Sequence, residues 1–240
     1  MIDNTENPRV TRHLSPVTTD PQHELFDVLD SDGEPTGEQK PRWQVHRDGD
    51  WHAALHIWVY GVRDDGTPFV LFQRRSRTKD TWPDYLDVAV GGHLRAGESL
   101  IETAREAEEE LGLVVTLADL IPIGRHFFCS QRDGVIDREL HHVFAIRRDD
   151  PLETYVLHPE EVSAIVAIPI AAALQLFKSD VDEIFASERQ RSGASDEDIV
   201  LRRTDFAGLR TEYPMCAITT LAEMVRGEHI APFELRTTQG

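Results

Sequence analysis

The segment from Gly91 to Leu113 joins a glycine turn to a short stretch that is rich in glutamate. Ser99 and Glu102 have the spacing of a capping box, and Gly112 lies where a helix C-terminus favours a left-handed residue. These signals predict a helix over about residues 100–111. Small and apolar side chains recur there at the spacing of one buried stripe: Leu100, Ala104, Ala107 and Leu111. The helix should therefore pack on a core through one face.

Three acidic side chains lie beside that stripe, within an arc of roughly 100°: Glu106, Glu109 and Glu110. Like charges this close repel each other, so the cluster is costly unless a cation neutralises it. Magnesium suits the role because it prefers oxygen ligands and bridges carboxylates to the phosphates of a substrate. The alternative is the solvated face of an ordinary surface helix, which is what most glutamate-rich runs are.

The residues around these glutamates form a joint pattern: Gly91-Gly92, Gly97-Glu98, Arg105-Glu106, Glu109-Glu110 and Gly112. This pattern resembles the Nudix box, the signature of hydrolases that split nucleoside or other organic diphosphates. The resemblance implies that Glu106, Glu109 and Glu110 are metal ligands. It also implies that Arg105 orients the box by pairing with a carboxylate, with Glu98 as a supporting acid. The chain departs from the usual box in one respect, because it has one residue fewer between Glu98 and Arg105.

A wider resemblance, from near Glu24 to Met215, narrows to isopentenyl diphosphate isomerase and its hydrolase-like relatives. It is carried by Arg42, His46, His52, Arg74-Arg75, Lys79, Trp82-Pro83, Gly92-His93 and Asp137-Arg138-Glu139. In the isomerases three histidines and two acids hold a metal. The matching residues here are His46, His52, His93, Asp137 and Glu139. Imidazole and carboxylate together suit zinc, manganese or magnesium, so a second metal site is expected. Each histidine taken singly is more often an ordinary surface or core histidine, and His56 is expected to be structural.

Local cations matter because the chain as a whole is acidic, with 43 acidic against 25 basic residues and a net charge of −18. Such a surface should repel nucleic acid and anionic membranes. By the resemblance, Arg42, Arg75 and Lys79 contact the diphosphate beside Gly92. Arginine offers bidentate phosphate recognition and lysine a point charge, so the mixture is chemically reasonable. The alternative reading of these cations is a solvated loop.

The isomerases protonate an alkene with a cysteine, aided by a tyrosine and a tryptophan. The matching positions here are Gly91, Phe127 and Met215. Gly91 has no side chain to carry a proton, so the isomerisation apparatus is missing. Phe127 and Met215 are instead expected to contact the substrate in an outer pocket, together with Phe128. Their apolar character allows a prenyl chain or a stacked base.

The sequence therefore favours a metal-dependent hydrolase of an organic or nucleoside diphosphate, with magnesium or manganese as cofactor. Glu98, Glu109 and Glu139 are the candidate general bases. Two alternatives stay open. The first is an enzyme like the isomerases, supported by the histidine and acid positions. The second is a non-catalytic module that binds a diphosphate ligand, supported by the shortened box.

The expected fold class is α/β, an α/β/α sandwich with a mixed β-sheet, as the resemblance also implies. We predict a flexible N-terminal tail over residues 1–22 and a single Nudix-like domain over 23–240 that ends in a helical extension. Strands are predicted at 54–62, 69–73, 87–90, 125–129, 141–147 and 164–168, after a first hairpin turn at Asp32-Gly33. Helices are predicted from 169 and over 216–226, with a polar loop at 188–198.

Two cysteines, Cys129 and Cys216, and the absence of a signal segment or a long apolar span predict a reduced, cytoplasmic protein. The expected partner is a small-molecule diphosphate, with neither nucleic acid nor membrane as a partner. A homodimer is left open.

Overall fold

The computed structural model describes residues 21–239 apart from 80, 133–134, 194 and 209–211. All but the last two positions of the predicted tail therefore lie outside the described residues. The strands are β1 (Leu25–Leu29), β2 (Pro35–Pro41), β3 (Trp51–Val62), β4 (Pro68–Arg75), β5 (Leu86–Val88), β6 (Val90–His93), β7 (Ile121–Arg132), β8 (Val135–Arg147), β9 (Val162–Pro169), β10 (Glu183–Gln190), β11 (Glu197–Arg202) and β12 (Phe233–Gln239). The helices are α1 (Arg42–Asp48), α2 (Leu100–Thr103), α3 (Arg105–Leu111), α4 (Ile170–Lys178) and α5 (Glu212–Val225), with short 3₁₀ turns at Leu152–Thr154 and Arg203–Asp205.

Strand β3 is the centre of a large sheet with the order β11-β10-β9-β4-β3-β8-β7-β12. On one edge β3 pairs in parallel with β8, and on the other it pairs antiparallel with β6 near its start and with β4 near its end. Strands β7 and β12 are also parallel, whereas β4 and β9 are antiparallel. The sheet is mixed, as predicted. Gly91 and Gly92, which were expected to form a turn, lie instead in β6, where they pair with His56 and Leu55 of β3.

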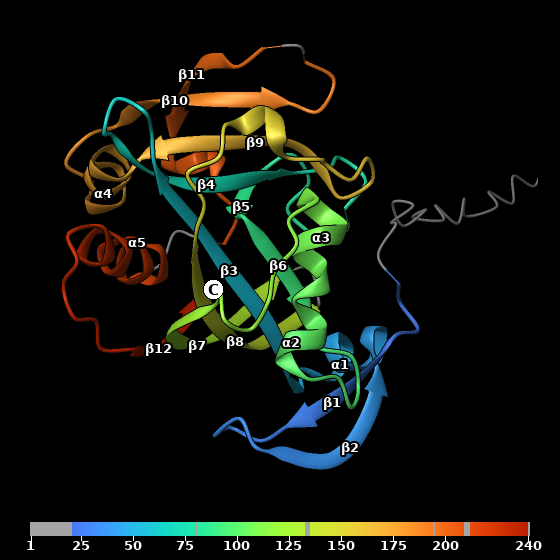
Figure 1. The fold of residues 1–240 in the computed structure, drawn as a ribbon. Coiled ribbons are helices and arrows are strands. Elements are labelled where there is room, and N and C mark those ends of the chain that lie inside the picture. The colour runs from blue at the N-terminus through green and yellow to red at the C-terminus, as the bar shows by residue number, and fades with distance from the viewer. Residues whose placement is uncertain (1–20, 80, 133–134, 194, 209–211, 240) are drawn as a thin grey trace, which may run out of the picture.

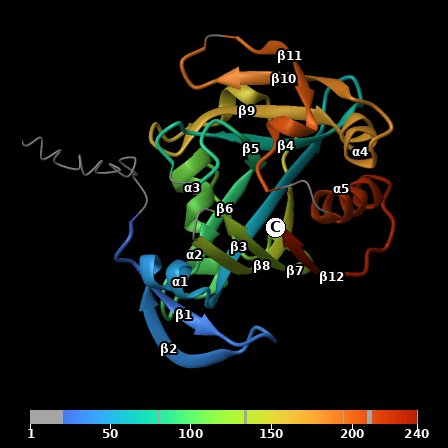
Figure 2. The same ribbon diagram turned by 180° about the vertical axis from the view of Figure 1, so that it is seen from behind.

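Helices cover both faces of this sheet (Figure 1, Figure 2). Neighbouring residues of β3 point to opposite faces, so Trp58 packs into a core with α4 and α5, and Ile57 into a core with α2 and α3. Leu221 of α5 and Leu111 of α3 are fully buried in these two cores. The predicted α/β sandwich is therefore confirmed. Within the described ranges, no helix has the length and apolar character that crossing a membrane requires.

The box helix differs from the single helix predicted over 100–111. Its capping box at Ser99 and its left-handed C-cap at Gly112 are both present, but the helix is interrupted at Ala104, where ψ is −10°. Helices α2 and α3 lie on either side of this interruption. The break falls between Glu98 and Arg105, in the stretch that is one residue shorter than the usual box. A shorter connection with fixed ends requires a local change of helical geometry.

The polar segment 188–198, predicted as a loop, belongs instead to a hairpin of β10 and β11. Ile184 and Ala186 of β10 are buried, whereas Phe185 between them is exposed. The hairpin was missed because one face of its strands meets solvent and reads as polar. Glu188 is buried too, and Arg74 donates to its carboxylate at 2.6 Å.

The predicted C-terminal helix is present as α5, but the chain continues into a strand that was not predicted. Strand β12 runs parallel to β7, with Thr237 beside Phe128. Phe233, Leu235 and Thr237 are half-buried, and the residues between them are exposed. This alternation is the period of a strand with one covered face. The C-terminal extension is therefore a helix followed by an edge strand.

Candidate active site

Two of the box glutamates are withdrawn from solvent, Glu110 fully and Glu106 in part. Burial raises the pKa of Glu106 to about 7. Burial, followed by the nearby carboxylates of Glu106 and Glu161, raises the pKa of Glu110 well above its usual range. Gln73 of β4 donates to Glu110 Oε2 at 3.3 Å. A divalent cation would relieve this crowding of buried carboxylates, so these residues fit the metal expected of them.

Arg105 joins the turn to the helix. Its Nη1 lies 2.9 Å from Glu98 Oε1, its Nη2 lies 2.9 Å from Glu106 Oε1, and its Nε lies 3.5 Å from Glu109 Oε1. The other oxygen of Glu98 accepts a hydrogen bond from the backbone N–H of Arg95 at 2.9 Å. The pairing expected for Arg105 is therefore present, and it spans the interruption between α2 and α3.

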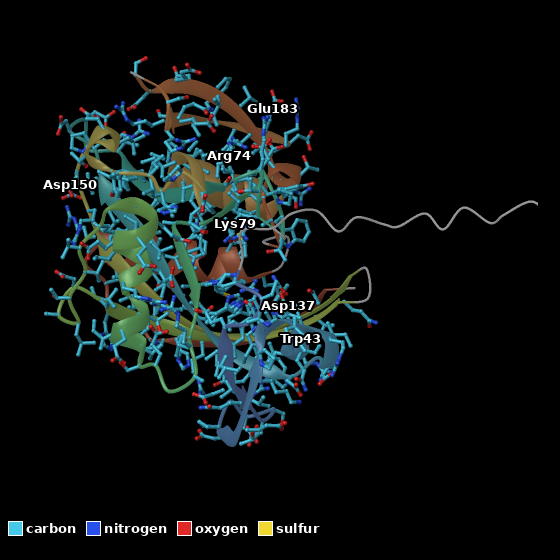
Figure 3. The ribbon with its side chains drawn as sticks, turned by 90° about the vertical axis from the view of Figure 1, so that its right-hand side faces the viewer. Trp43, Arg74, Lys79, Asp137, Asp150 and Glu183 are labelled. Carbon is cyan, nitrogen blue, oxygen red and sulfur yellow. The ribbon has the colours of Figure 1, made fainter. Side chains whose placement is uncertain are left out.

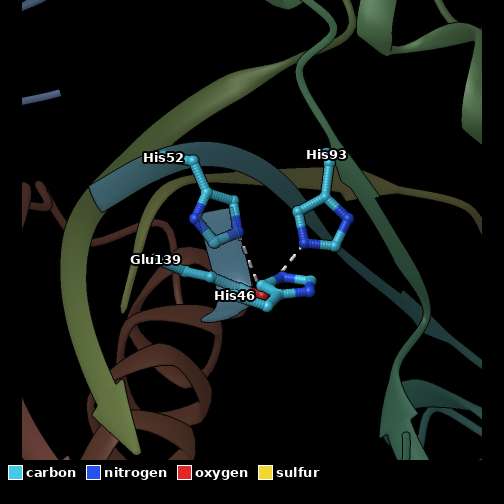
Figure 4. Close-up of side chains that lie close together, drawn as sticks. All are labelled: His46, His52, His93 and Glu139. Atoms are coloured by element: carbon cyan, nitrogen blue, oxygen red, sulfur yellow. Dashed lines mark hydrogen bonds and ion pairs between the residues drawn. The ribbon is translucent and has the colours of Figure 1, made fainter. Parts of the chain in front are cut away.

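The predicted second group of ligands also comes together, from four different elements (Figure 4). Ligand atoms of His46, His52, His93 and Glu139 all lie within 4.8 Å of one another. Asp137 Oδ1 lies 3.8 Å from His46 Nε2 and 3.9 Å from His52 Nε2. We call these five residues the histidine–acid cluster. Burial would raise the pKa of Glu139, but His93 and hydrogen bonds from His141 and His93 outweigh it and hold this pKa well below its usual range.

The Nε2 atom of His52 carries the strongest indication that this cluster suits a metal. It is buried and has no hydrogen-bond partner among the described residues, and it lies 3.9 Å from both Asp137 Oδ1 and Glu139 Oε1. Two ligands that are each about 2.1 Å from one ion lie about 3 to 4 Å apart. The spacing therefore suits a shared cation better than a direct hydrogen bond. Burial, with His93 nearby, lowers the pKa of His52 well below its usual range, which keeps its lone pair available.

A cavity of about 140 Å³ has walls from both groups of acids. Its walls include Arg42, Arg75, Lys79, Gly92, His93, Glu110, Asp137 and Glu139. Lys79, in the loop after β4, and Asp137, on β8, both line this cavity and are labelled in Figure 3. Arg75 Nη1 lies 3.2 Å from Asp87 Oδ2, and Lys79 Nζ lies 2.6 Å from Glu161 Oε2. The three predicted phosphate-binding cations thus border one cavity in an otherwise acidic protein.

Aromatic rings form another part of the cavity wall: His56, His126, Phe128, His141 and Tyr213. Trp58 Nε1 donates to Tyr213 Oη at 2.9 Å, and Tyr213 Oη lies 2.8 Å from His56 Nδ1. The ring of His126 stacks on Tyr213 with centroids 4.2 Å apart. His56, expected to be structural, therefore has a place at the cavity.

Eight of the predicted site residues are absent from the cavity wall: Glu98, Arg105, Glu106, Glu109, His46, His52, Phe127 and Met215. Phe127 is buried on the other face of β7, in a small core with Leu140. Successive residues of a strand point to opposite faces, so Phe128 lies at the cavity instead. Met215 is replaced by Tyr213, which lies two residues earlier on α5. The Glu109 side chain is 53% exposed and lies against Arg105.

Sequence reasoning missed His126, His141 and Tyr213. Asp137, Glu139 and His141 are successive i, i+2 positions of β8, so the alternation of side chains along a strand predicts that His141 shares the face of the two acids. No local pattern identifies Tyr213, because its place at the cavity depends on how α5 packs over the sheet.

A family model described as the NUDIX domain matches residues 50–187. Nudix hydrolase 3 of Arabidopsis thaliana is 42% identical over 151 residues, which cover 61% of this chain and 19% of that protein. An uncharacterised Nudix hydrolase of Clostridium acetobutylicum is 34% identical over 168 residues, covering 69% of this chain and 79% of that protein. The chain belongs to the NUDIX family and is a Nudix hydrolase.

One relative is consistent with the resemblance to the isomerase branch. An isopentenyl-diphosphate Delta-isomerase of Clavibacter sepedonicus is 34% identical over 145 residues, which cover 59% of this chain and 72% of that protein. The NUDIX match excludes Arg42 and His46 before it and Tyr213 after it. The cavity thus draws residues from both flanks of the matched segment, and the histidine–acid cluster draws His46 from the N-terminal flank.

Proposed function

We propose that the chain is a metal-dependent hydrolase of a small organic diphosphate. The observation that carries this proposal is one cavity that combines the box carboxylate Glu110, the three cations and part of the histidine–acid cluster. Cations in a cavity of an acidic protein select an anionic ligand, and carboxylates beside them select a ligand that arrives with metal.

Arg42, Arg75 and Lys79 bind the diphosphate in this proposal. Arg75 is held by Asp87 and by the backbone carbonyl of Thr81, to which its Nε donates at 2.9 Å. A guanidinium fixed in this way presents its remaining N–H groups in one orientation. Lys79 supplies a mobile point charge that exchanges Glu161 for a phosphate oxygen. Together they position the phosphorus atom and offset charge on the leaving phosphate.

The box residues Glu106, Glu109 and Glu110 would hold magnesium or manganese, and His46, His52, His93, Asp137 and Glu139 would hold a second metal. When bound, such an ion polarises the diphosphate and lowers the pKa of water. Arg105 keeps Glu106 and Glu109 oriented. Among the candidate bases, Glu98 is engaged by Arg95 and Arg105, and Glu139 by His93 and His141. Glu109 is the most exposed of the three, but it also pairs with Arg105 and does not line the cavity, so all three carboxylates stay candidate bases.

Isomerisation remains the second candidate, favoured by the similarity to the Clavibacter isomerase and by the histidine–acid cluster. A Cβ at Gly91 would meet its nearest neighbours, Val88 and His56, at 3.5 and 3.6 Å, so the position has room for a side chain. Glycine has no side chain, however, so nothing at position 91 can carry a proton. Binding without turnover is the third candidate, and it is favoured by the shortened box.

A ³¹P and ¹H NMR time course separates the three. Isopentenyl diphosphate and a panel of nucleoside diphosphates and triphosphates are each incubated with protein and magnesium, with and without chelator. Hydrolysis gives new phosphate resonances that vanish with chelator and in Glu110→Gln, but persist in Glu108→Gln, an exposed carboxylate on the same helix. A migrating double bond with unchanged phosphorus signals supports isomerisation instead. Perturbed ligand signals without any product support the binding module.

A further inference from the structure

Glu139 is held from two sides. Its Oε1 lies 3.0 Å from His93 Nε2, within the histidine–acid cluster. Its Oε2 contacts Nε2 of His141, which lies two residues further along β8 and is buried. One oxygen of this carboxylate therefore faces the expected metal, and the other is engaged outside the cluster.

The contact with His141 is the end of a longer chain of hydrogen bonds. His141 Nδ1 lies 3.1 Å from Nδ1 of His126 on β7, and His126 Nε2 lies 2.7 Å from Oγ1 of Thr237 on β12. Strands β8, β7 and β12 are consecutive in the sheet (Figure 1). The chain thus crosses three neighbouring strands, from the C-terminal strand to an expected metal ligand.

The chemistry of the last acceptor sets the direction of the protons. A carboxylate only accepts, so His141 donates to Glu139 from Nε2. With both rings neutral, His141 then accepts at Nδ1 from His126 Nδ1. His126 in turn accepts at Nε2 from the Thr237 hydroxyl. Every donor in this chain of hydrogen bonds therefore points toward Glu139. Removal of the Thr237 hydroxyl leaves the His126 ring without its donor.

We propose that Thr237 is a positioning residue that fixes Glu139 as a metal ligand through His126 and His141. The C-terminal strand thereby completes a metal centre whose other residues lie more than ninety positions earlier. Hydrogen bonds that lock ligand orientation in this way set metal affinity, and their loss lowers it by about 10–100-fold. The inference rests on the proposed function, because it takes the histidine–acid cluster to be a metal site. Thr237 lies outside the NUDIX match, which ends at residue 187.

Strand β12 offers matched variants for a test. Thr237→Val keeps the shape of the side chain and removes the hydroxyl, and Thr237→Ser restores it. Thr238→Val makes the same change at the next residue, whose side chain is exposed and faces away. His52→Ala removes a ligand and identifies the portion of metal binding that belongs to the cluster.

The experiment measures Zn²⁺ affinity of the chelator-treated full chain by competition with a chromophoric chelator, alongside thermal unfolding without metal. Thr237→Val is expected to weaken the His52-dependent affinity about tenfold, with Thr237→Ser and Thr238→Val within about twofold of wild type. Without metal, Thr237→Val should melt below Thr238→Val, because it leaves the buried His126 ring without its partner. A spectroscopic affinity of this kind does not depend on turnover.

Three results count against the proposal. If Thr237→Val binds Zn²⁺ like Thr238→Val, the positioning role is wrong while the metal site stands. If affinity falls but Thr237→Ser does not restore it, the threonine acts by packing rather than by its hydroxyl. If wild type has no binding that His52→Ala removes, the metal site of the proposed function fails, and this inference fails with it.

Discussion

Gly92 and Glu106 approach so closely that only glycine fits between β6 and α3. A Cβ at Gly92 would lie 2.4 Å from Glu106 Cγ, inside any real contact between carbon atoms. The Glu106 side chain therefore rests directly on the backbone of β6, and the position of this expected metal ligand depends on the absence of a side chain at Gly92.

Gly92→Ala is expected to displace Glu106 and to lower magnesium affinity by about tenfold or more, as loss of ligand orientation does elsewhere. Gly91→Ala is the matched control, because its Cβ would have 3.5 Å of room. Magnesium titrations monitored by the activity found in the NMR panel, and Mn²⁺ binding by electron paramagnetic resonance, give the affinity. Equal affinities for the two variants would contradict the close-contact argument.

The contribution of Glu106 to the stability of the metal-free protein should fall as pH rises from about 4.5 to about 7. In this window the unfolded chain has lost the Glu106 proton, whereas the folded protein keeps it because burial raises that pKa to about 7. The difference from 4.5 corresponds to at most about 3 kcal/mol. Urea unfolding with chelator at a series of pH values measures it. Glu106→Gln should remove this contribution, so the stability difference between wild type and the variant should change by that amount across the window, and added magnesium should offset the loss at pH 8. A variant whose slope equals that of wild type would assign the titration to another group.

Arg105 and Glu98 should be energetically coupled. Their 2.9 Å ion pair is half-buried, so a double-mutant cycle of Arg105→Ala and Glu98→Gln is expected to give about 1–2 kcal/mol of coupling free energy. Glu108, on the same helix, is exposed and forms no ion pair with Arg105 within the part of the chain that the structure describes, so the coupling of Glu108→Gln should stay below about 0.5 kcal/mol. Chemical denaturation of the five variants provides the cycle. Equal couplings for both carboxylates would mean that Arg105 does not tie the turn to the helix.

Removal of the phosphate-binding cations should weaken substrate binding. Arg75→Ala and Lys79→Met are each expected to raise KM for the diphosphate substrate by about tenfold, since each loses a charge-assisted contact. Arg77→Ala is the control, because it lies in the same segment but its side chain is 83% exposed and outside the cavity wall. Steady-state kinetics at two salt concentrations separate a specific contact from general charge. The site assignment fails if Arg77→Ala raises KM as much as the other two.

Local spacing was enough to predict much of the site. The capping box, the C-cap glycine and the carboxylate rhythm are properties of consecutive residues, and they identified the helix. Arg105, Asp137 and Glu139 came from the resemblance, and the period of a strand is consistent with Asp137 and Glu139 facing the same side. The histidine–acid cluster was reached only by resemblance, because His52 and His93 are brought together by the pairing of β3 with β6.

The remaining errors have identifiable physical causes. Phe127 and Phe128 differ by one position, and one position on a strand reverses the face, so a small error in register moves a residue from the cavity to the core. The spacing from Glu98 to Arg105 is one residue shorter than in the usual box. The spacing alone does not show whether the segment before the helix or the helix itself absorbs this difference, so the interruption at Ala104 was not predicted. Tyr213 and Thr237 reach the site through packing over long sequence separations, which no window of the sequence contains.

The division of the cavity between the NUDIX segment and its flanks has an evolutionary consequence. The box glutamates lie in the shared segment, whereas Arg42 precedes it and Tyr213 follows it. Recombination that exchanges the terminal segments would therefore change part of the cavity wall, and it would also replace His46 of the histidine–acid cluster and Thr237. Chimaeras between this chain and its Clostridium relative would thus change the molecules that fit the cavity and the second expected metal site together, while the box stays the same.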